Sequence, residues 1–235
     1  MTDDLLNEDD LAALRALDTP TVCNAIEVLA PERRGYGYTV EPLICSYPEL
    51  PPMVGYARTA TIRAMHPPKA APEEVQATRI GYYEYVEAGP RPSIIVIQDL
   101  DPVPGYGSFW GEVQSNVHKG LGALGTITNG CVRDIPDCAE GFQFMSASIK
   151  PSHAAVHVVA YGLEVTVAGM DVSSGDLIHA DRHGAVVVPL AIARDIPKTA
   201  ETIARKEAVV IGAARKPGFS VADLREAFKK QADIH

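Results

Sequence analysis

Three side chains near the middle of the chain have the types needed to hold a divalent metal ion and a small organic acid. Glu112 follows a Trp-Gly pair, and Arg133 and Asp134 stand side by side after an interval of twenty residues. Carboxylates are hard oxygen ligands that suit Mg²⁺ or Mn²⁺ with several waters retained. A guanidinium donates forked hydrogen bonds, which suit a carbonyl oxygen that becomes an enolate. These residue types favour metal-assisted chemistry on an oxo acid.

The segments around these residues are predicted to form a strand, a helix and a second strand. Residues 93–99 are an apolar, β-branched run typical of a strand buried on both faces. Residues 112–124 carry apolar residues at helical spacing, Gly125 is expected to end that helix, and residues 126–132 are typical of another strand. In such a βαβ unit the strands run parallel, so their carboxyl ends and the helix start share one edge of the sheet.

Ligands of open α/β sheets bind at that edge, and the free amides of a helix start suit a carboxylate. The sequence therefore predicts one pocket with Asp134 and Glu112 as metal ligands and with Trp110, Gly111 and Arg133 as substrate-binding residues. Two alternatives stay open. Arg133 forms only a surface salt bridge with a neighbouring acid, or Trp110 packs in the core or a subunit interface instead of forming a pocket wall.

The remaining pattern alternates helices with strands, and no repeat, charge block or low-complexity linker divides it. This alternation predicts a single α/β domain over residues 1–235 with helices on the outside. Proline and capping signals place helix starts at Thr19, Pro72 and Ser220. The further helices are expected at residues 11–17, 191–214 and 220–232, and the further strands at residues 60–65, 154–159, 163–167 and 185–189.

Composition excludes several classes of protein. The chain has 235 residues with 30 acidic against 21 basic side chains, a net charge of −9, which makes a nucleic-acid backbone an unsuitable ligand. With 46% hydrophobic and 22% charged residues, the composition is that of a globular protein and not of a disordered one. No apolar run is long enough to span a bilayer.

Targeting and redox signals indicate a cytoplasmic protein. The acidic amino terminus, Met1-Thr2-Asp3-Asp4, has neither the basic start of a secretory signal nor the character of a transit peptide. The four cysteines show no CxxC spacing, so we expect free, mostly buried thiols. Cys131 is interpreted as a small buried residue and not as a nucleophile, because no histidine beside it in sequence would activate it.

Four histidines form two His-x-x-x-His pairs, His153 with His157 and His179 with His183. This spacing brings two imidazoles together only on a helix, and both pairs fall in strand-like or turn segments. We therefore expect polar packing and not a zinc site. The alternative is that a pair at the pocket rim contacts substrate.

The central motif also resembles a known family. Gly111-Glu112 followed by Gly130-Cys131-Val132-Arg133-Asp134, with twenty residues between Glu112 and Arg133, is similar to the acid-X20-Arg-Asp signature of the class II pyruvate aldolases. These are the 4-hydroxy-4-methyl-2-oxoglutarate / 4-carboxy-4-hydroxy-2-oxoadipate aldolases, in the family that includes the regulator of ribonuclease E activity A. The resemblance covers about residues 17–214, including segments 17–25, 55–60 and 174–189.

The resemblance implies a β/β/α swivelling-type fold and a homotrimer or homohexamer with active sites at subunit boundaries. It implies cleavage of a 4-hydroxy-2-oxo acid to pyruvate plus a second oxo acid, with oxaloacetate decarboxylation as a side activity. In this family pattern Asp134 binds Mg²⁺ or Mn²⁺, Arg133 stabilises the pyruvate enolate, and Glu112 holds metal-bound water or helps in proton transfer. Glu207 is the positional match for an acid that the neighbouring subunit's late helix contributes.

One position favours an enzyme over a regulator. In the ribonuclease-regulating branch the residue after the motif arginine is not aspartate, whereas here it is Asp134. Ser173-Ser174 and the long aromatic loop at residues 101–109 depart from the aldolase pattern and concern the identity of the substrate. The alternatives are a non-catalytic regulator that binds a protein partner and a metal-dependent lyase or hydrolase acting on an unrelated acid.

Overall fold

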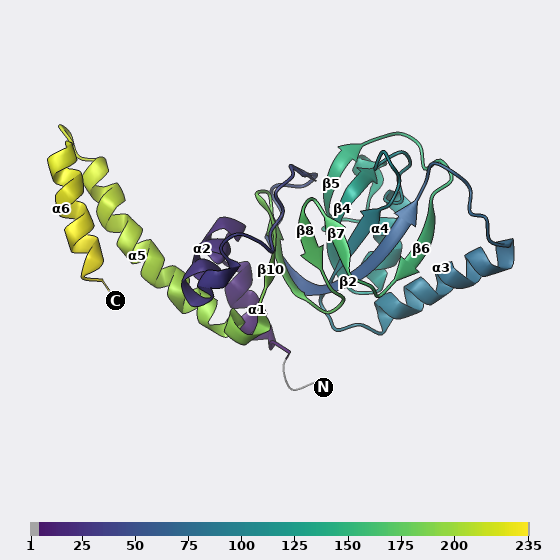
Figure 1. Cartoon of the computed structure of the whole chain (residues 1–235), viewed down its shortest axis with the longest axis horizontal. Helices are drawn as coiled ribbons and strands as arrows, with labels where there is room; N and C mark the ends of the chain where they lie inside the picture. The colour runs from purple at the N-terminus through teal and green to yellow at the C-terminus, as the bar shows by residue number, and fades with distance from the viewer. Residues whose placement is uncertain (1–4, 235) are drawn as a thin grey trace.

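In the computed structural model, which describes residues 5–234, eight strands form one curled sheet (Figure 1). Their order is β1-β5-β4-β3-β2-β9-β10, and β6 pairs with the far half of β2. A separate hairpin, β7 with β8, packs over one face. The strands are β1 Ile44–Cys45, β2 Met53–Arg63, β3 Ser93–Asp99, β4 Ala123–Val132, β5 Gln143–Ile149, β6 His157–Tyr161, β7 Val165–Val167, β8 Met170–Val172, β9 Leu177–Asp181 and β10 Gly184–Val188.

Strands β2, β3, β4 and β5 run parallel in the centre of the sheet, and their neighbours outside this group are antiparallel. Ile94, Ile95, Val96 and Ile97 of β3 are completely buried, as expected for a strand covered on both faces. One face packs under the β7–β8 hairpin, and the other face packs against aromatic and aliphatic side chains from α3, β6 and the chain around α4. The predicted βαβ unit is confirmed: β3, α4 (Glu112–Gly120) and β4 follow one another.

Two details of that unit differ from the expectation. Helix α4 ends at Gly120, because the chain turns at Gly122 with φ +91°, and β4 already begins at Ala123. Gly125 therefore lies inside β4 and does not end the helix. A Cβ at Gly125 would stand 2.3 Å from the backbone oxygen of Gln143 in β5, so the close approach of these strands requires glycine there.

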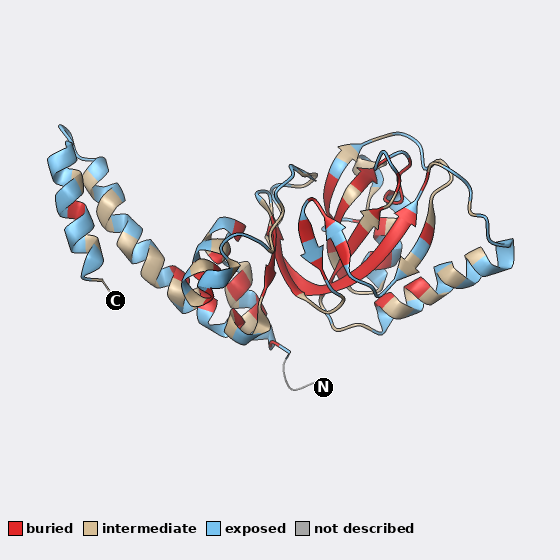
Figure 2. Cartoon of the chain, in the orientation of Figure 1, coloured by how far each residue is buried: buried red, intermediate tan, exposed pale blue. Residues whose placement is uncertain are grey.

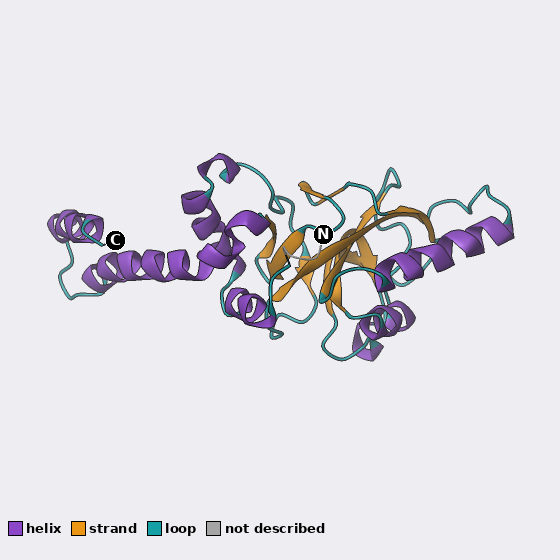
Figure 3. Cartoon of the chain, turned by 90° about the horizontal axis from the view of Figure 1, so that it is seen from below, coloured by secondary structure: helices purple, strands orange, loops and turns teal. Residues whose placement is uncertain are grey.

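The helices lie outside the sheet (Figure 3). Helices α1 and α2 pack together with the start of α5 against the part of the sheet formed by β9, β10 and the start of β2. The helices are α1 Glu8–Arg15, α2 Thr19–Leu29, α3 Pro72–Glu87, α4 Glu112–Gly120, α5 Ile196–Ala214 and α6 Val221–Ala232, with short 3-10 turns η1 Pro31–Arg33, η2 Ile135–Asp137 and η3 Leu190–Asp195.

The capping signals are partly confirmed. Ser220 and Asp223 form the expected capping box at the start of α6. Helix α2 begins at Thr19 as expected, but its cap is Asp18, whose carboxylate accepts a hydrogen bond from the Thr21 amide at 2.8 Å. A carboxylate at this position also interacts favourably with the positive end of the helix.

Helices α5 and α6 form an arm that projects away from the sheet (Figure 1). Helix α5 contacts α1, α2, η3 and α6, and Figure 2 shows most of the arm exposed. Only Ile196 and Ala200 of α5 and Ala227 of α6 are buried. The chain thus combines a well-packed α/β body with a thin helical extension.

Several smaller expectations can also be compared with the structure. All four cysteines are free, but only Cys131 is buried, so the expectation of mostly buried thiols is wrong. Strands β1, β5, β8 and β9 are not among the strands expected from the residue pattern, and β9 lies in the segment 174–189 that carries the family resemblance. Among residues 5–234, no helix combines the length and the apolar character needed to cross a membrane. Residues 1–4, on which the expectation about targeting rests, lie outside the described part of the chain.

Candidate active site

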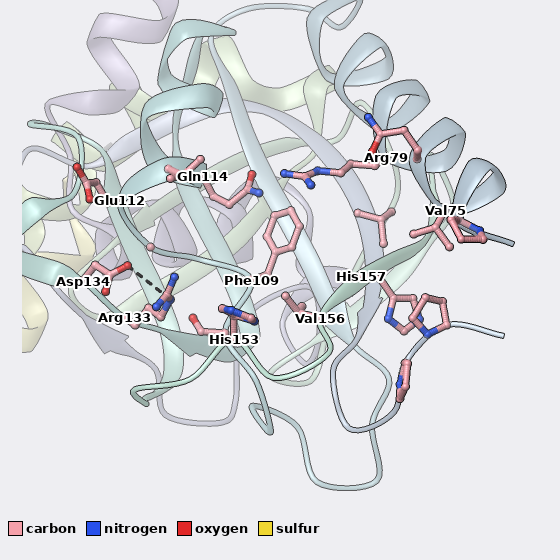
Figure 4. Close-up of a pocket in the computed structure, with 18 of the residues that line it drawn as sticks. Val75, Arg79, Phe109, Glu112, Gln114, Arg133, Asp134, His153, Val156 and His157 are labelled. Atoms are coloured by element: carbon pink, nitrogen blue, oxygen red, sulfur yellow. Dashed lines mark ion pairs between the residues drawn. The ribbon is translucent and has the colours of Figure 1, made fainter. Parts of the chain in front are cut away.

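The structure brings Gly111, Glu112, Arg133 and Asp134 to one wall of a single cavity (Figure 4). The chain entering α4 runs beside the end of β4, where Trp110 forms a parallel bridge with Val132. The Arg133 amide donates to the Trp110 carbonyl oxygen at 3.0 Å. These backbone contacts hold the two halves of the motif together despite the twenty residues that separate them in sequence.

Gly111 permits this close approach. A Cβ built at Gly111 would stand 2.7 Å from Oδ2 of Asp134 and 3.2 Å from Cγ of Arg133. The first of these distances is below normal van der Waals contact, so any side chain at position 111 would push the carboxylate aside. The glycine of the motif is therefore explained by space and not by backbone freedom, since its φ of −176° is ordinary extended backbone.

Asp134 has an unusual backbone conformation, with φ 55° and ψ 28° in the left-handed region. This conformation is uncommon for residues other than glycine, although aspartate adopts it more readily than most. It ends β4 sharply, and the Asp134 carbonyl then accepts from the Asp137 amide at 2.9 Å in η2. Strained residues that the surrounding structure holds in place are frequent at functional sites.

Arg133 and Asp134 form an ion pair, with 3.5 Å between Nε and Oδ2. The salt bridge raised as an alternative is therefore present, but both side chains also line the cavity and are 36% and 34% exposed. A pair this exposed adds little to stability. Both groups remain accessible to a ligand in the cavity.

The cavity has a volume of about 730 Å³, within the range of clefts that hold small molecules. It has a polar end, where the four motif residues lie, and an apolar end formed by prolines and valines that precede or begin α3 or lie near β6 (Figure 4). Phe109 lies between the two ends. These prolines and valines are Pro67, Pro68, Pro72, Val75, Val156 and Val158, all of which line the cavity.

His153 and His157 also line the cavity, so this pair lies where it could contact a ligand. Nδ1 of His153 lies 2.7 Å from the Ala154 carbonyl oxygen, and Nδ1 of His157 lies 2.9 Å from that of Ala155. A carbonyl oxygen only accepts hydrogen bonds, so Nδ1 carries the proton in each ring. Each ring is therefore held at the cavity rim by a hydrogen bond from Nδ1.

The other histidine pair has a packing role, as expected. His179 is completely buried, accepts from the Thr19 hydroxyl at Nδ1 (3.0 Å), and has Nε2 3.1 Å from the carbonyls of Leu14 and Leu17. Burial lowers the pKa of His179 below its usual value. His183 instead pairs with Asp181 at 3.0 Å on the surface.

The Trp110 ring is 1% exposed and does not line the cavity. It packs against Phe109, Phe142 and His118 in the aromatic core. The alternative of core packing thus describes this ring, while the Trp110 backbone positions the motif. Ser108 supports the same turn, with its Oγ 2.6 Å from the Trp110 carbonyl oxygen and 2.8 Å from that of Cys131.

His118 connects α4 to α3 in the core through hydrogen bonds at both ring nitrogens. Its Nδ1 donates to the Gln114 carbonyl oxygen at 2.7 Å, which leaves Nε2 to accept from the Tyr82 hydroxyl at 2.7 Å. Burial lowers the pKa of His118 to about 4, so the ring is neutral at neutral pH. Cys131 is also buried, which raises the pKa of its thiol and agrees with its interpretation as a packing residue.

Glu207 lies away from this cavity within its own chain. It is exposed on α5, and α5 packs against α1, α2, η3 and α6. None of these elements lines the cavity. Arg79, Phe109 and Gln114 also line the cavity but are not among the site residues expected from the sequence. For Arg79 the reason is that nothing in the spacing of α3 indicates that this helix forms a wall.

The donor set is suited to a hydrated metal ion. Within residues 5–234, no group of three or more His, Cys, Asp or Glu side chains is placed to hold a metal. Two carboxylate residues, Glu112 and Asp134, line the polar end. Mg²⁺ is commonly bound by one or two carboxylates, with water and substrate filling the remaining positions. These two residues therefore fit Mg²⁺ or Mn²⁺ in a site that substrate completes.

Comparisons with solved structures agree with the fold. An uncharacterized protein from Pseudomonas syringae pv. tomato has a TM-score of 0.70 at 21% identity, covering 96% of this chain and 95% of that one. A protein described among novel cellulases from gut-associated microbes has a TM-score of 0.70 at 17% identity, covering 86% of this chain and 87% of that one. Streptomyces coelicolor RraAS2, an unusual member of the RNase ES inhibitor RraA protein family, has a TM-score of 0.67 at 22% identity, covering 86% of this chain and 95% of that one.

A search of curated protein sequences gave no match. The family model described as RraA-like, Aldolase/RraA, matches residues 19–187. This segment contains the whole βαβ unit and the motif from Gly111 to Asp134. Because the match spans well over half of the chain, the protein belongs to the RraA-like family, which includes both aldolases and ribonuclease inhibitors.

Proposed function

We propose that the protein is a divalent-metal-dependent carbon–carbon lyase. It cleaves a 4-hydroxy-2-oxo acid to pyruvate and a second oxo acid, and it decarboxylates oxaloacetate through the same pyruvate enolate. The observation that carries this proposal is the placement of Asp134 beside Arg133 and against Gly111 on the wall of the cavity. A hard carboxylate ligand and a guanidinium are the groups that enolate chemistry requires.

The start of α4 binds the carboxylate of the 2-oxo acid in this proposal. Its cap residue is Gly111, and no side chain caps the first turn. The first backbone amides of the helix therefore lack an intrahelical partner, and they belong to Glu112, Val113 and Gln114, which line the cavity. Amides at a helix start stabilise a negative charge.

Arg133 stabilises the enolate oxygen that both reactions produce. In the aldol cleavage the 4-hydroxyl loses its proton, the C3–C4 bond breaks, and its electron pair forms the enolate of pyruvate. In the decarboxylation the same C3–C4 bond breaks with release of CO₂. Protonation of C3 then gives pyruvate in both cases. Donors already directed at the developing charge are worth roughly 10²–10³-fold in rate.

Glu112 is the proposed acceptor of the 4-hydroxyl proton, because its carboxylate lies at the same polar end (Figure 4). Together with Asp134 it would hold Mg²⁺ or Mn²⁺, which supplies Lewis-acid polarisation of the 2-oxo group when bound. Glu207 is proposed to complete the site of another copy of the chain. The exposed arm formed by α5 and α6 supports this, and a homotrimer or homohexamer is the proposed assembly.

The test is a screen of small oxo and hydroxy acids, with pyruvate release as the readout. Oxaloacetate and 4-hydroxy-4-methyl-2-oxoglutarate are the leading substrates, each with Mg²⁺, with Mn²⁺ and with a chelator, against blanks without protein. Enzyme-dependent pyruvate release that needs metal supports the proposal. Absence of pyruvate from every acid in the panel contradicts it and favours the regulator alternative, which a stoichiometric protein partner in a pull-down would support.

A further inference from the structure

The first half of α3 forms the outer wall of the cavity. Pro72, Val75, Gln76 and Arg79 all line the cavity, and their spacing places them on one face of the helix. The second half of α3 is anchored instead, because Tyr82 and Val86 are buried in the core. The cavity wall is therefore held from one end.

Arg79 extends from this wall into the middle of the cavity. Figure 4 shows its side chain directed away from α3, toward Gln114 and Phe109. Its guanidinium carbon lies 6.0 Å from the centre of the Tyr83 ring. The Tyr83 hydroxyl donates to Oε1 of Gln114 at 3.0 Å, which ties α3 to α4 beside the arginine. Tyr83 thus supports Arg79 from the helix side.

The charge of Arg79 is not balanced by a carboxylate. Among residues 5–234, no acidic oxygen lies within ion-pair distance of its guanidinium, whereas Arg133 is paired with Asp134. Of the cavity's acids, Glu112 and Asp134 both lie at the polar end, away from Arg79 (Figure 4). A positive group with five donors that faces a cavity in a chain of net charge −9 is available to an anion.

We infer that Arg79 binds a second carboxylate of the substrate and so selects oxo diacids over oxo monoacids. This inference rests on the proposed function, because that function fixes the 2-oxo acid end of the substrate between the α4 start, Arg133 and Asp134. The rest of the substrate then extends over Phe109, and its far end meets the Arg79 guanidinium. A planar guanidinium binds a carboxylate with two parallel hydrogen bonds, which lysine does not reproduce.

Binding of two unreactive probes tests the inference without requiring turnover. 2-Oxoglutarate and 2-oxopentanoate share the 2-oxo acid end and chain length and differ only in a distal carboxylate replaced by a methyl group. Their affinities are measured by titration calorimetry with Mg²⁺ present, for wild type, Arg79→Ala, Arg79→Lys and Arg225→Ala. Arg225 is exposed on α6, so its replacement changes net charge by the same amount outside the cavity.

We expect wild type to bind 2-oxoglutarate more tightly than 2-oxopentanoate. Arg79→Ala should weaken the binding of 2-oxoglutarate about tenfold, which is the scale of a lost hydrogen bond between charged groups. The same substitution should leave the affinity for 2-oxopentanoate within about twofold of the wild-type value, as expected for a surface substitution. Arg79→Lys should fall between wild type and Arg79→Ala, and Arg225→Ala should match wild type for both probes.

The remaining outcomes separate this inference from the proposed function. Equal wild-type affinity for the two probes, or equal weakening of both by Arg79→Ala, overturns the role of Arg79 and leaves the lyase standing. The expected pattern without pyruvate release from any hydroxy acid overturns the lyase and keeps the role of Arg79. Failure of wild type to bind either probe overturns the role of Arg79, and pyruvate release in the substrate screen then decides the lyase separately.

Discussion

The cavity edge and the helical arm place the proposed functional side chains in opposite ways. At the cavity edge, parallel strands buried on both faces fix Arg133 and Asp134 against Gly111 within one chain. The arm holds Glu207 on an exposed helix that meets no part of the cavity. Groups that need close geometry thus lie on the rigid body, while a group on the arm reaches a cavity only in an assembly. The following predictions test this difference.

Asp134→Asn should have the largest effect. Asparagine is nearly the same size and also tolerates the left-handed backbone at this position, so the fold should be retained. Loss of the charged ligand should lower metal-dependent pyruvate release by about 10³-fold. Steady-state rates over a range of Mn²⁺ concentrations measure this, with thermal unfolding as the control for folding. Turnover close to that of wild type would show that Asp134 is not part of the site.

Gly111→Ala should lower turnover by about 10²-fold, because the added Cβ displaces the Asp134 carboxylate and small misplacements at a reacting centre are costly. Gly120→Ala is the matched control. It is the last residue of the helix that Gly111 caps, and a Cβ there meets nothing within 4 Å. Comparing kcat and thermal stability for both variants tests the prediction. A Gly111→Ala protein as active as the control would mean that this close contact is unimportant.

Glu207→Gln should reduce turnover by about tenfold, the scale expected for a group that orients a metal site from outside. The sharper experiment mixes unfolded Glu207→Gln and Asp134→Asn chains and refolds them together. If each site combines the body of one copy with the arm of another, about a quarter of the sites in a random mixture regain both groups. Activity no higher than the average of the two separate variants would show that the arm does not complete a neighbouring site.

The smallest effect on activity and a clear effect on stability are expected for His118. Its pKa is about 4 in the folded protein because it is buried, against about 6.5 when unfolded. The unfolded state therefore binds more protons between these values. The contribution of this group to the free energy of unfolding is therefore fully present above pH 6.5. It is lost as the pH falls toward 4, and the loss is about 3 kcal/mol.

Urea unfolding of wild type and His118→Gln at pH 7 and pH 4.5 measures this contribution. The variant should lose less unfolding free energy on acidification than wild type, with turnover at pH 7 little changed. Identical pH dependence in the two proteins would mean that His118 does not resist protonation in the folded state.

The sequence predicted the βαβ edge because its signals are local. An apolar β-branched run, a helix start and a second run directly before Arg133 determine where the strand ends meet. The face of α4 was less predictable. Its apolar residues Val113 and Val117 are 65% and 37% exposed, while Ser115 and His118 are buried because each has hydrogen-bond partners in the core. Tertiary pairing thus outweighs the hydrophobic pattern here.

The opposite wall of the cavity was not predictable from spacing. Arg79 is an ordinary exposed position in an α3 sequence with no feature that marks a ligand site, and only the way α3 leaves the sheet places it over the cavity. Strand β5 was missed for a related reason, since Gln143, Ser146 and Ser148 interrupt its apolar pattern. The Gln143 side chain forms two hydrogen bonds with the Tyr47 backbone, which lies far away in sequence. Both depend on contacts between segments distant in sequence.

The most direct test is the effect of Arg133 on two reactions measured side by side. Rates of oxaloacetate decarboxylation and of 4-hydroxy-4-methyl-2-oxoglutarate cleavage are compared in wild type, Arg133→Lys and Arg133→Ala, with metal-only blanks subtracted. One shared enolate at the cavity edge predicts that both rates fall by the same factor in each variant, about 10²–10³-fold for alanine. Loss of one reaction with the other unchanged, or no loss of either, would contradict a single enolate site at Arg133.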